Sequence, residues 1–294
     1  MIQWNWFNRL STVLKTRQKI LLARSLQIVV MAFRHVFRLG PVSNVTRKCL
    51  RWHLDLREGI DFSIWLLGSF EPKTIRCYSA IIKPGDTVLD IGANIGAHTV
   101  PIAELVGENG RVIAFEPTDY AFSKLCKNVA ANPKLAGRVK CLQTMLIDSI
   151  DGTTPPPLYS SWPLAQEHGL HAEHRGKLMS TNGASATTLD TALDALSPDR
   201  VDCVKVDIDG FECQMLRGAS KCLSRWHPVL VMELSPYVLD EQGDSVEELL
   251  RILVEHGYSI YTLDGATQIS TDPKAIRRMI PTGAGINVLA RAER

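Results

Sequence analysis

The chain is 294 residues long, 45% hydrophobic and 22% charged, a composition that fits one folded domain with an appendage and excludes wholesale disorder. Its formal net charge of +2 hides an asymmetry, because residues 1–54 contain ten Lys and Arg but no Asp or Glu, so the remainder is net acidic. A basic segment ahead of an acidic body fits either an anionic surface or packing on the body. The seven cysteines have no disulfide-like or metal-ligand spacing, which favours a reducing, cytoplasmic location.

Residues 1–50 are predicted to form a basic, amphipathic helical segment that ends at Gly40-Pro41. The two faces of the helix follow from the 3.6-residue period. The apolar face is Leu22, Leu26, Val29, Val30, Phe33, Val36 and Phe37, and the opposite face is Arg17, Arg24, Gln27, Arg34 and Arg38. Three interpretations stay open: the apolar face packs on the domain, contacts another copy, or lies in a membrane interface. The apolar run is too short for a transmembrane helix.

Residues 51–294 are predicted to form one α/β domain that opens with a cap at 51–82. Within the cap, Trp52 to Phe70 alternates apolar and polar residues around Glu58-Gly59, which predicts a β-hairpin. From Thr74 on, strand-like and helical patterns alternate, as in a parallel sheet covered by helices. Residues 151–186 break this order and are predicted to be an irregular insertion, either a mobile loop over a binding site or a disordered segment.

The expected fold class is α/β, with a Rossmann-like, seven-stranded, mostly parallel sheet, helices on both faces and an antiparallel C-terminal hairpin after the N-terminal helical segment. The predicted strands are Thr87–Ile91, Arg111–Phe115, Val139–Leu146, Val201–Val206, Val229–Met232, Tyr258–Leu263 and Ile286–Ala290. The predicted helices are Ala97–Val106, Tyr120–Ala131, Leu189–Leu196, Phe211–Leu223 and Val246–His256.

The most specific pattern joins the first strand to its helix, in Val88-Leu89-Asp90-Ile91-Gly92-Ala93-Asn94-Ile95-Gly96. Glycines at this junction let backbone amides come close to a ligand, and the helix N-terminus adds a positive dipole end. A dinucleotide would place its pyrophosphate there, but Asp90 suits the ammonium group of S-adenosylmethionine and would be badly placed beside phosphates. We therefore predict S-adenosylmethionine as the cofactor, bound by Asp90, Gly92, Ala93, Asn94 and Gly96.

Further cofactor contacts are expected at the second strand and the first helix. Glu116 ends the second strand ahead of Pro117, at about the twenty-residue spacing of a carboxylate that accepts ribose hydroxyls. The alternative is a glycine turn needed only for packing, with Glu116 on the surface. His98 lies just inside the first helix and is a candidate for the cofactor cleft, although a packing role competes with that interpretation.

Carboxylates end the fourth and fifth predicted strands, where ligands of open α/β sheets bind. Asp207 and Asp209 lie in Lys205-Val206-Asp207-Ile208-Asp209-Gly210-Phe211-Glu212, and Glu233 follows Val231-Met232. Such groups orient a hydroxyl, accept its proton or hold a cation, and we predict Asp207, Asp209 and Glu233 as catalytic residues. Two alternatives compete, since an Asp could cap the next helix and Lys205 could pair with one of the acids. No His joins them at ligand spacing, so no metal site is predicted.

With these motifs in order, the chain resembles the FkbM family of class I methyltransferases from about Arg51 to Met232. The matching blocks are Gly59-Ile60, Gly68-Ser69-Phe70-Glu71-Pro72, Asp90 to Gly96, Phe115-Glu116-Pro117, Asn128, Asn132, Thr188-Leu189-Asp190 and Lys205 to Glu212. The last block resembles the family's Lys-x-Asp-x-Glu-Gly-x-Glu signature, with Asp209 in place of its central Glu.

The resemblance implies S-adenosylmethionine as cofactor and methyl transfer to oxygen on small molecules or saccharides. It also implies that Glu71 lies near the methionine end of the cofactor or near the acceptor. The expected partner is therefore a small-molecule or glycan acceptor, with no nucleic acid. Two other classes stay open: a dinucleotide-dependent oxidoreductase, and a catalytically inactive, membrane-associated binding protein.

Overall fold

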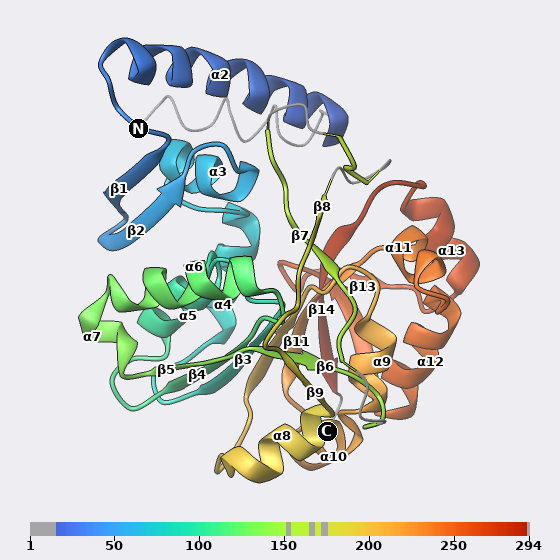
Figure 1. Cartoon of the computed structure of the whole chain (residues 1–294). Helices are drawn as coiled ribbons and strands as arrows, with labels where there is room; N and C mark the ends of the chain where they lie inside the picture. The colour runs from blue at the N-terminus through green and yellow to red at the C-terminus, as the bar shows by residue number, and fades with distance from the viewer. Residues whose placement is uncertain (1–15, 151–153, 165–167, 172–175, 293–294) are drawn as a thin grey trace.

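The structure is a computed structural model, which describes residues 16–150, 154–164, 168–171 and 176–292 (Figure 1). Its centre is an eight-stranded sheet with the order β13-β12-β14-β11-β10-β3-β4-β5. The strands are β3 (Thr87–Ile91), β4 (Arg111–Phe115), β5 (Val139–Leu142), β10 (Cys203–Val206), β11 (Val229–Leu234), β12 (Tyr258–Thr262), β13 (Gln268–Ile269) and β14 (Ile286–Ala292).

The predicted sheet is confirmed apart from its strand count and the end of its third strand, since the strand predicted at Val139–Leu146 ends at Leu142 and residues 144–146 leave the sheet. Strands β5, β4, β3, β10 and β11 pair in parallel, and β14 inserts antiparallel between β11 and β12. Seven strands were predicted, and the eighth is the two-residue β13, which pairs with the edge strand β12 through Ile260 and Ile269. So short a strand gives no period that a sequence pattern could reveal.

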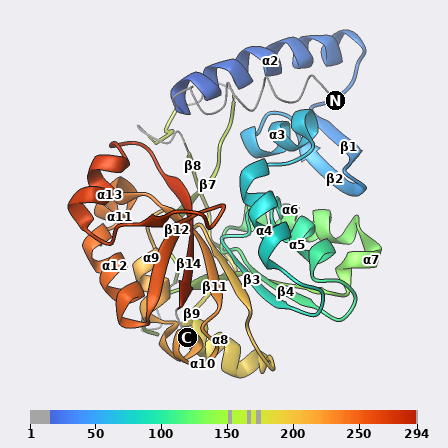
Figure 2. The ribbon, with the colours of Figure 1, turned by 180° about the vertical axis from the view of Figure 1, so that it is seen from behind.

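Helices cover both faces of the sheet (Figures 1 and 2). Val88 and Val112 pack on one face with α4 and α5, while Leu89 and Ile91 pack on the other face with α8, α9, α10 and α12. The helices that follow the cap are α4 (Pro72–Ile81), α5 (Thr99–Leu105), α6 (Asp119–Ala130), α7 (Pro133–Ala136), α8 (Leu189–Leu196), α9 (Glu212–Arg217), α10 (Ser220–Trp226), α11 (Pro236–Glu241), α12 (Val246–Glu255) and α13 (Pro273–Met279).

The helix predicted at Phe211–Leu223 is two helices, because the chain turns at Gly218. A Cβ there would lie 2.2 Å from the carbonyl oxygen of Ile147, so the neighbouring backbone occupies that space. The second helix, α10, begins on the Asp190 carboxylate, which accepts hydrogen bonds from the amides of Lys221 and Cys222 at 2.8 and 2.9 Å. Asp190, part of the family-like Thr188-Leu189-Asp190 block, thus caps a helix.

The hairpin predicted around Glu58-Gly59 is wrong. The cap has a hairpin earlier, formed by β1 (Val42–Arg47) and β2 (Leu50–Asp55), and then a helix, α3 (Gly59–Leu67). The helix is fixed by a contact distant in sequence, since the buried Asp61 carboxylate accepts from Lys124 Nζ of α6 at 2.6 Å. Local alternation could not reveal that tertiary contact.

Two asparagines of α6 and the turn after it join β2 to the domain. Asn132 accepts from the amide of Arg51 and donates to its carbonyl, both at 2.8 Å. Asn128, which is fully buried, accepts from the amide of His53 and donates to the carbonyl of Ile95, again at 2.8 Å. Side-chain amides therefore satisfy the backbone of β2 where another strand is absent, and they link the cap to the glycine-rich loop.

Residues 151–186, expected to be irregular, contain short strands in their described parts. β7 (Leu158–Ser161) and β8 (Lys177–Met179) pair antiparallel, and β9 (Ser185–Thr187) pairs with β6 (Thr144–Leu146). Figures 1 and 2 show β7 and β8 as an arm that extends from the sheet towards the N-terminal helix. The arm is attached to the cap, because the amide of Gly59 donates to the carbonyl of Trp162 at 2.9 Å.

The N-terminal helix, α2 (Thr16–Val36), lies across the cap at the top of the molecule (Figure 1). Val30 and Met31 pack on the cap, and the buried Gln27 donates to the carbonyl of Leu56 at 3.3 Å. Residues 1–15 and the side chains of Arg17 and Leu22 lie outside the described residues. Within the described part of the chain, no helix is long and apolar enough to cross a membrane.

Candidate functional site

The carboxyl ends of β3, β4, β10 and β11 meet at one edge of the sheet, below the cap and the arm. The loop after β3 bonds mainly to the neighbouring strand end: the amides of Gly92 and Ala93 both donate to the carbonyl of Phe115 at 3.0 Å. The amide of Asn94 donates to Glu116 Oε2 at 2.9 Å. The predicted cofactor residues of β3 and β4 are therefore brought together.

Glu116 is buried, not on the surface as the alternative interpretation held. Besides the bond from Asn94, its carboxylate accepts from the amide of Thr118 at 3.0 Å and from the Thr118 hydroxyl at 2.5 Å. Ser160 of the arm lies 2.7 Å from that hydroxyl. Burial raises the pKa of Glu116, and these donors oppose the rise. Pro117, the next residue, is half-buried.

The glycines of the loop are required by packing. Gly92 has φ +76, and a Cβ there would lie 1.9 Å from the carbonyl oxygen of Asp207. Gly96 has φ +86, and its Cβ would lie 3.0 Å from the Leu125 side chain. Gly92 thus lets the loops after β3 and β10 come into backbone contact. Asn94 also has a left-handed backbone, with φ +48.

Lys205 lies buried between these two loops. Its ammonium donates to the carbonyls of Gly92 and Ile91 at 2.6 and 3.2 Å, and ion-pairs with Asp90 at 3.4 Å and Asp207 at 3.8 Å. Burial lowers the pKa of Lys205, but the carboxylates of Asp90 and Asp207 more than offset that effect and raise it. The ion-pair role considered for Lys205 is confirmed.

Asp90 is completely buried, and its Oδ2 accepts from the Thr99 hydroxyl at 2.5 Å. Its other oxygen has no hydrogen-bond partner, although Lys205 lies nearby. Asp90 therefore organises the start of α5 and the position of Lys205. Direct contact between Asp90 and a cofactor stays a prediction.

The acids after β10 and β11 form one electrostatic cluster. Burial first, and then the charge of Asp207, raises the pKa of Asp209 and of Glu233 well above the ordinary values. Asp209 has a left-handed backbone, φ +50, and α9 has no side-chain cap, so Asp209 does not serve as that cap. Glu212 instead accepts from the amide of Ile208 at 3.2 Å, and burial raises its pKa to about 7.

Glu71 reaches the same cluster from the start of α4. Its Oε2 accepts from Asn287 of β14 at 2.8 Å and from the Thr74 hydroxyl at 3.1 Å. Burial, and then the charge of Asp207, raises the pKa of Glu71 to about 7. Asn287 lies directly opposite Glu233 across the β11–β14 pair, so it links the two acids.

Sequence reasoning missed Asn287, Thr74 and Ser160. Asn287 carried a weak signal, because it is the one polar residue in the apolar run from Ile286 to Ala290. Nothing in the pattern connects Ser160 or Thr74 with the strand ends, since those contacts depend on how the arm and the cap pack.

His98 is buried between aromatic rings rather than open to solvent. Its ring packs edge-on against Phe70 and Tyr78, with centroids 5.8 and 5.6 Å away, and its Nε2 lies 3.6 Å from Glu71. Burial lowers the pKa of His98 to about 4, so the ring is neutral at pH 7. Neither ring nitrogen, nor the Tyr78 hydroxyl, has a hydrogen-bond partner.

The residues present fit a cationic cofactor. Five acidic side chains at this edge interact with one another or with the Lys205 ammonium, those of Glu71, Asp90, Asp207, Asp209 and Glu233. Acidic groups suit a ligand that carries a sulfonium and an ammonium, because the cation favours their ionised form, whereas a pyrophosphate would be repelled by those that are ionised. Unpartnered buried atoms of His98, Tyr78 and Asp90 add polar groups that a ligand could satisfy. Among the described residues, no group of three or more His, Cys, Asp or Glu is arranged to hold a metal ion.

The fold and this edge define a Rossmann-like methyltransferase. Its sheet departs from the 3-2-1-4-5-6 order of dinucleotide enzymes by inserting an antiparallel strand, β14, between the last two. Residues 90–260 match the model of the methyltransferase FkbM domain, and the chain belongs to that family. S-adenosylmethionine is its methyl donor.

Individual relatives are more distant. The chain is 27% identical over 205 residues to methyltransferase sdnD of Sordaria araneosa, covering 58% of this chain and 78% of that protein. It is 26% identical over 168 residues to hexuronic acid methyltransferase AglP of Haloferax volcanii, covering 55% and 61%. A solved FkbM methyltransferase from Methylobacillus flagellatus is 16% identical with a TM-score of 0.41, covering 74% of this chain and 50% of that one.

The contact between the two central loops generates a prediction about stability. Gly92→Ala should lower the free energy of unfolding by about 3 kcal/mol, because a methyl group would overlap the backbone of Asp207 and force the loops apart. Urea denaturation followed by circular dichroism measures the loss.

A matched control is Gly243→Ala, which has a similar backbone, φ +78, but open space around its Cβ position. It should cost only about 1 kcal/mol, from backbone conformation alone. Equal losses of unfolding free energy in the two variants would show that the contact between the loops at Gly92 contributes nothing to stability.

Proposed function

We propose that the chain is an S-adenosylmethionine-dependent O-methyltransferase that methylates a hydroxyl group on a small molecule or saccharide. The observation that carries this proposal is the cluster of carboxylates at the cofactor edge, above all Glu71 with its pKa near 7. Oxygen methylation requires loss of the hydroxyl proton, and a carboxylate with a raised pKa is a better acceptor for it than an ordinary one.

The cofactor supplies a methyl group already activated by a sulfonium, so the protein's main tasks are alignment and proton removal. In this proposal Asp90, Gly92, Ala93, Asn94, Gly96, Glu116 and Pro117 form the cofactor side, with His98 as a neutral wall beside it. Asp207 and Glu233 orient the acceptor hydroxyl. Asp209 holds the bend of the loop that follows β10. Glu71 lies at the same edge of the sheet. It either binds the ammonium group of the cofactor or accepts the proton of the acceptor hydroxyl.

The name of AglP supports the choice of acceptor, whereas the name of sdnD gives no acceptor. AglP is a hexuronic acid methyltransferase, and sdnD is a methyltransferase. A sugar acid carries several hydroxyl groups and one carboxyl group, so it fits the proposed acceptor class. Membership in the FkbM family overturns the oxidoreductase alternative.

A methylation assay tests the proposal. The purified chain is incubated with S-adenosylmethionine carrying a labelled methyl group and a panel of sugars, uronic acids and hydroxylated metabolites. We expect label in at least one acceptor, as a methyl ether located by mass spectrometry. Asp207→Asn should lower kcat at least about tenfold if that residue orients the hydroxyl. Label found only as a carboxyl ester, or only on nitrogen or carbon, would contradict methylation of a hydroxyl, and no transfer despite cofactor binding would favour the inactive-protein alternative.

The raised pKa of Glu71 generates a prediction about pH. Either role of Glu71 needs the ionised carboxylate, which forms as pH rises through about 7. We therefore expect kcat/KM to be low at pH 6, to rise through pH 7 and to level off above it.

Glu71→Gln should abolish this rise, because the amide does not titrate. Glu212→Gln is the matched control, since Glu212 has a similar pKa of about 7 but bonds the backbone amide of Ile208. The Glu212→Gln variant should keep the rise of kcat/KM through pH 7. A pH profile unchanged by Glu71→Gln would remove Glu71 from both roles, and a change in KM for the cofactor alone would assign it to binding.

A further inference from the structure

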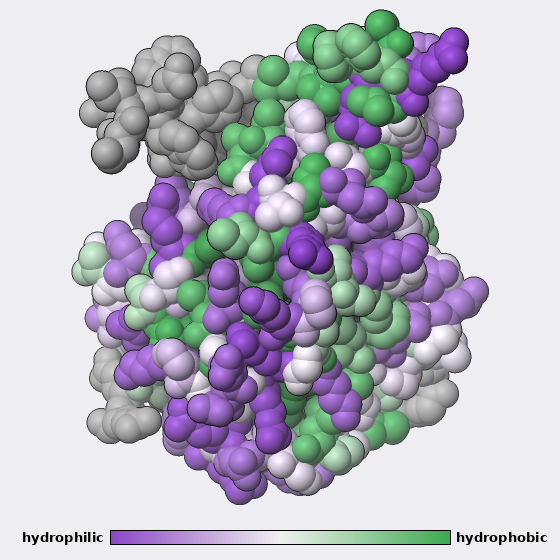
Figure 3. All heavy atoms as spheres, turned by 90° about the vertical axis from the view of Figure 1, so that its left-hand side faces the viewer, coloured by the Kyte–Doolittle hydropathy of each residue, from purple (hydrophilic) through white to green (hydrophobic). Residues whose placement is uncertain are grey.

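The N-terminal helix α2 turns its apolar face away from the protein. Three side chains of the predicted apolar face are among the most exposed large hydrophobic side chains of the described residues: Val29 at 67%, Phe33 at 60% and Val36 at 74%. Phe33 and Phe37 lie against each other on the outside, with ring centroids 4.4 Å apart. Figure 3 shows apolar side chains gathered at the top of the molecule, where α2 lies.

The side of α2 that contacts the cap is mixed, because Val30 and Met31 pack there beside polar side chains. Gln27 is 7% exposed and bonds the Leu56 carbonyl, and Arg34 is half-buried, donating to the carbonyls of Gly40 and Val42 at 2.7 and 3.0 Å. Among the described side chains of the predicted apolar face, only Val30 packs on the cap. α2 therefore packs on the cap and still leaves most of its predicted apolar face uncovered, which makes that face available for another contact.

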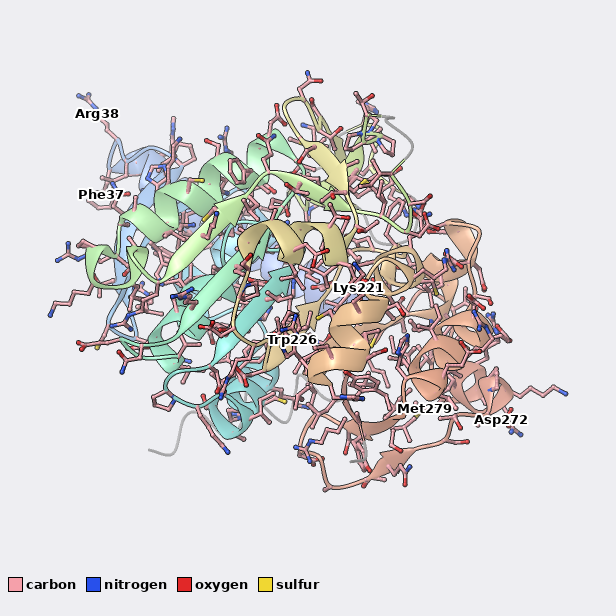
Figure 4. All side chains as sticks on the ribbon, turned by 90° about the horizontal axis from the view of Figure 1, so that it is seen from below. Phe37, Arg38, Lys221, Trp226, Asp272 and Met279 are labelled. Atoms are coloured by element: carbon pink, nitrogen blue, oxygen red, sulfur yellow. The ribbon has the colours of Figure 1, made fainter. Side chains whose placement is uncertain are left out.

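The positive charge of the N-terminal segment indicates what the apolar face of α2 contacts. Residues 1–54 contain ten basic residues and no acidic one. Arg38 projects from the end of α2 beside Phe37, as Figure 4 shows, and Lys48 and Arg51 of the adjoining hairpin are exposed as well. Two copies joined through this face would bring two such basic segments together, and their repulsion disfavours a dimer. A surface that is both apolar and negatively charged matches the apolar face of α2 and the basic residues of the N-terminal segment.

We propose that α2 binds the surface of an anionic lipid bilayer, with Val29, Phe33, Val36 and Phe37 inserted at the level of the headgroups. The helix lies in the plane of the membrane and does not cross it, and the basic residues of the N-terminal segment are attracted to anionic lipids. α2 packs on the same cap from which Glu71 enters the site. Together with the proposed function, this contact means that the acceptor is methylated by a protein held at the membrane. The membrane contact itself does not rest on the proposed reaction.

Flotation of the full chain with vesicles tests the proposal. One set of vesicles is phosphatidylcholine alone, and the other also contains phosphatidylglycerol. We expect the chain to float with the anionic vesicles and to stay behind with the neutral ones. High salt should weaken the binding, because it screens the attraction to the lipids.

Two matched triple variants identify the surface. Val29→Ser, Phe33→Ser and Val36→Ser together should reduce the affinity for anionic vesicles at least about tenfold, since they remove the inserted side chains. Leu178→Ser, Val254→Ser and Met279→Ser remove apolar side chains that are 50%, 53% and 47% exposed elsewhere, and should leave it unchanged. All six positions are exposed, so both proteins should fold, which circular dichroism checks.

Three results would overturn the proposal. The wild-type chain could fail to float with anionic vesicles, which would leave the face to residues 1–15 or another partner. The α2 triple variant could bind as well as the wild type. Light scattering could show a dimer in solution that this variant makes monomeric, which would assign the face to a second copy.

Discussion

The buried ammonium of Lys205 is the interaction on which the site depends. It joins the ends of the two central strands, because it donates to the loop after β3 and pairs with acids of both β3 and β10. Without it, Asp90 would be an unpaired buried charge, and the cost would be several kcal/mol. The same cation partly balances the acids at the rim, so Asp207 and its neighbours can gather there at all. One side chain thus sets both the geometry and the charge of the candidate site.

The cap and the arm complete that edge from outside the sheet. Asn128 forms hydrogen bonds with both β2 and the glycine-rich loop. Ser160 of the arm lies beside the hydrogen-bonded Glu116 and Thr118. Glu71, at the start of α4, accepts a hydrogen bond from Asn287. These contacts join segments far apart in sequence around the cofactor loop. The arm and the cap can therefore vary in sequence while the contact between β3 and β10 is kept, as expected of a fold that carries different sites.

The sequence predicted best the parts whose information is local. Thr87–Ile91 is a continuous apolar run that ends in a glycine turn, and it forms the strand as predicted. The grouping of Asp207 and Glu233 followed from the rule that parallel strands end at one edge. Tertiary contacts were out of reach: the Asp61–Lys124 pair makes α3 a helix, and no local pattern could show that Gln27, not Phe33, faces the cap. Gly92 was predicted from its place in the glycine-rich loop to approach the cofactor, which stays a prediction, and its close contact with the backbone of Asp207 had no local signal.

Calorimetric titration with S-adenosylhomocysteine tests most directly whether this edge of the sheet is a cofactor site. NAD serves as the competing ligand, and Glu116→Gln as the variant, because it removes the charge that holds Asn94 and Thr118. The account predicts saturable binding of S-adenosylhomocysteine, weakened in the variant, and no binding of NAD. A folded chain that gives no heat with S-adenosylhomocysteine, or that binds NAD instead, would contradict it.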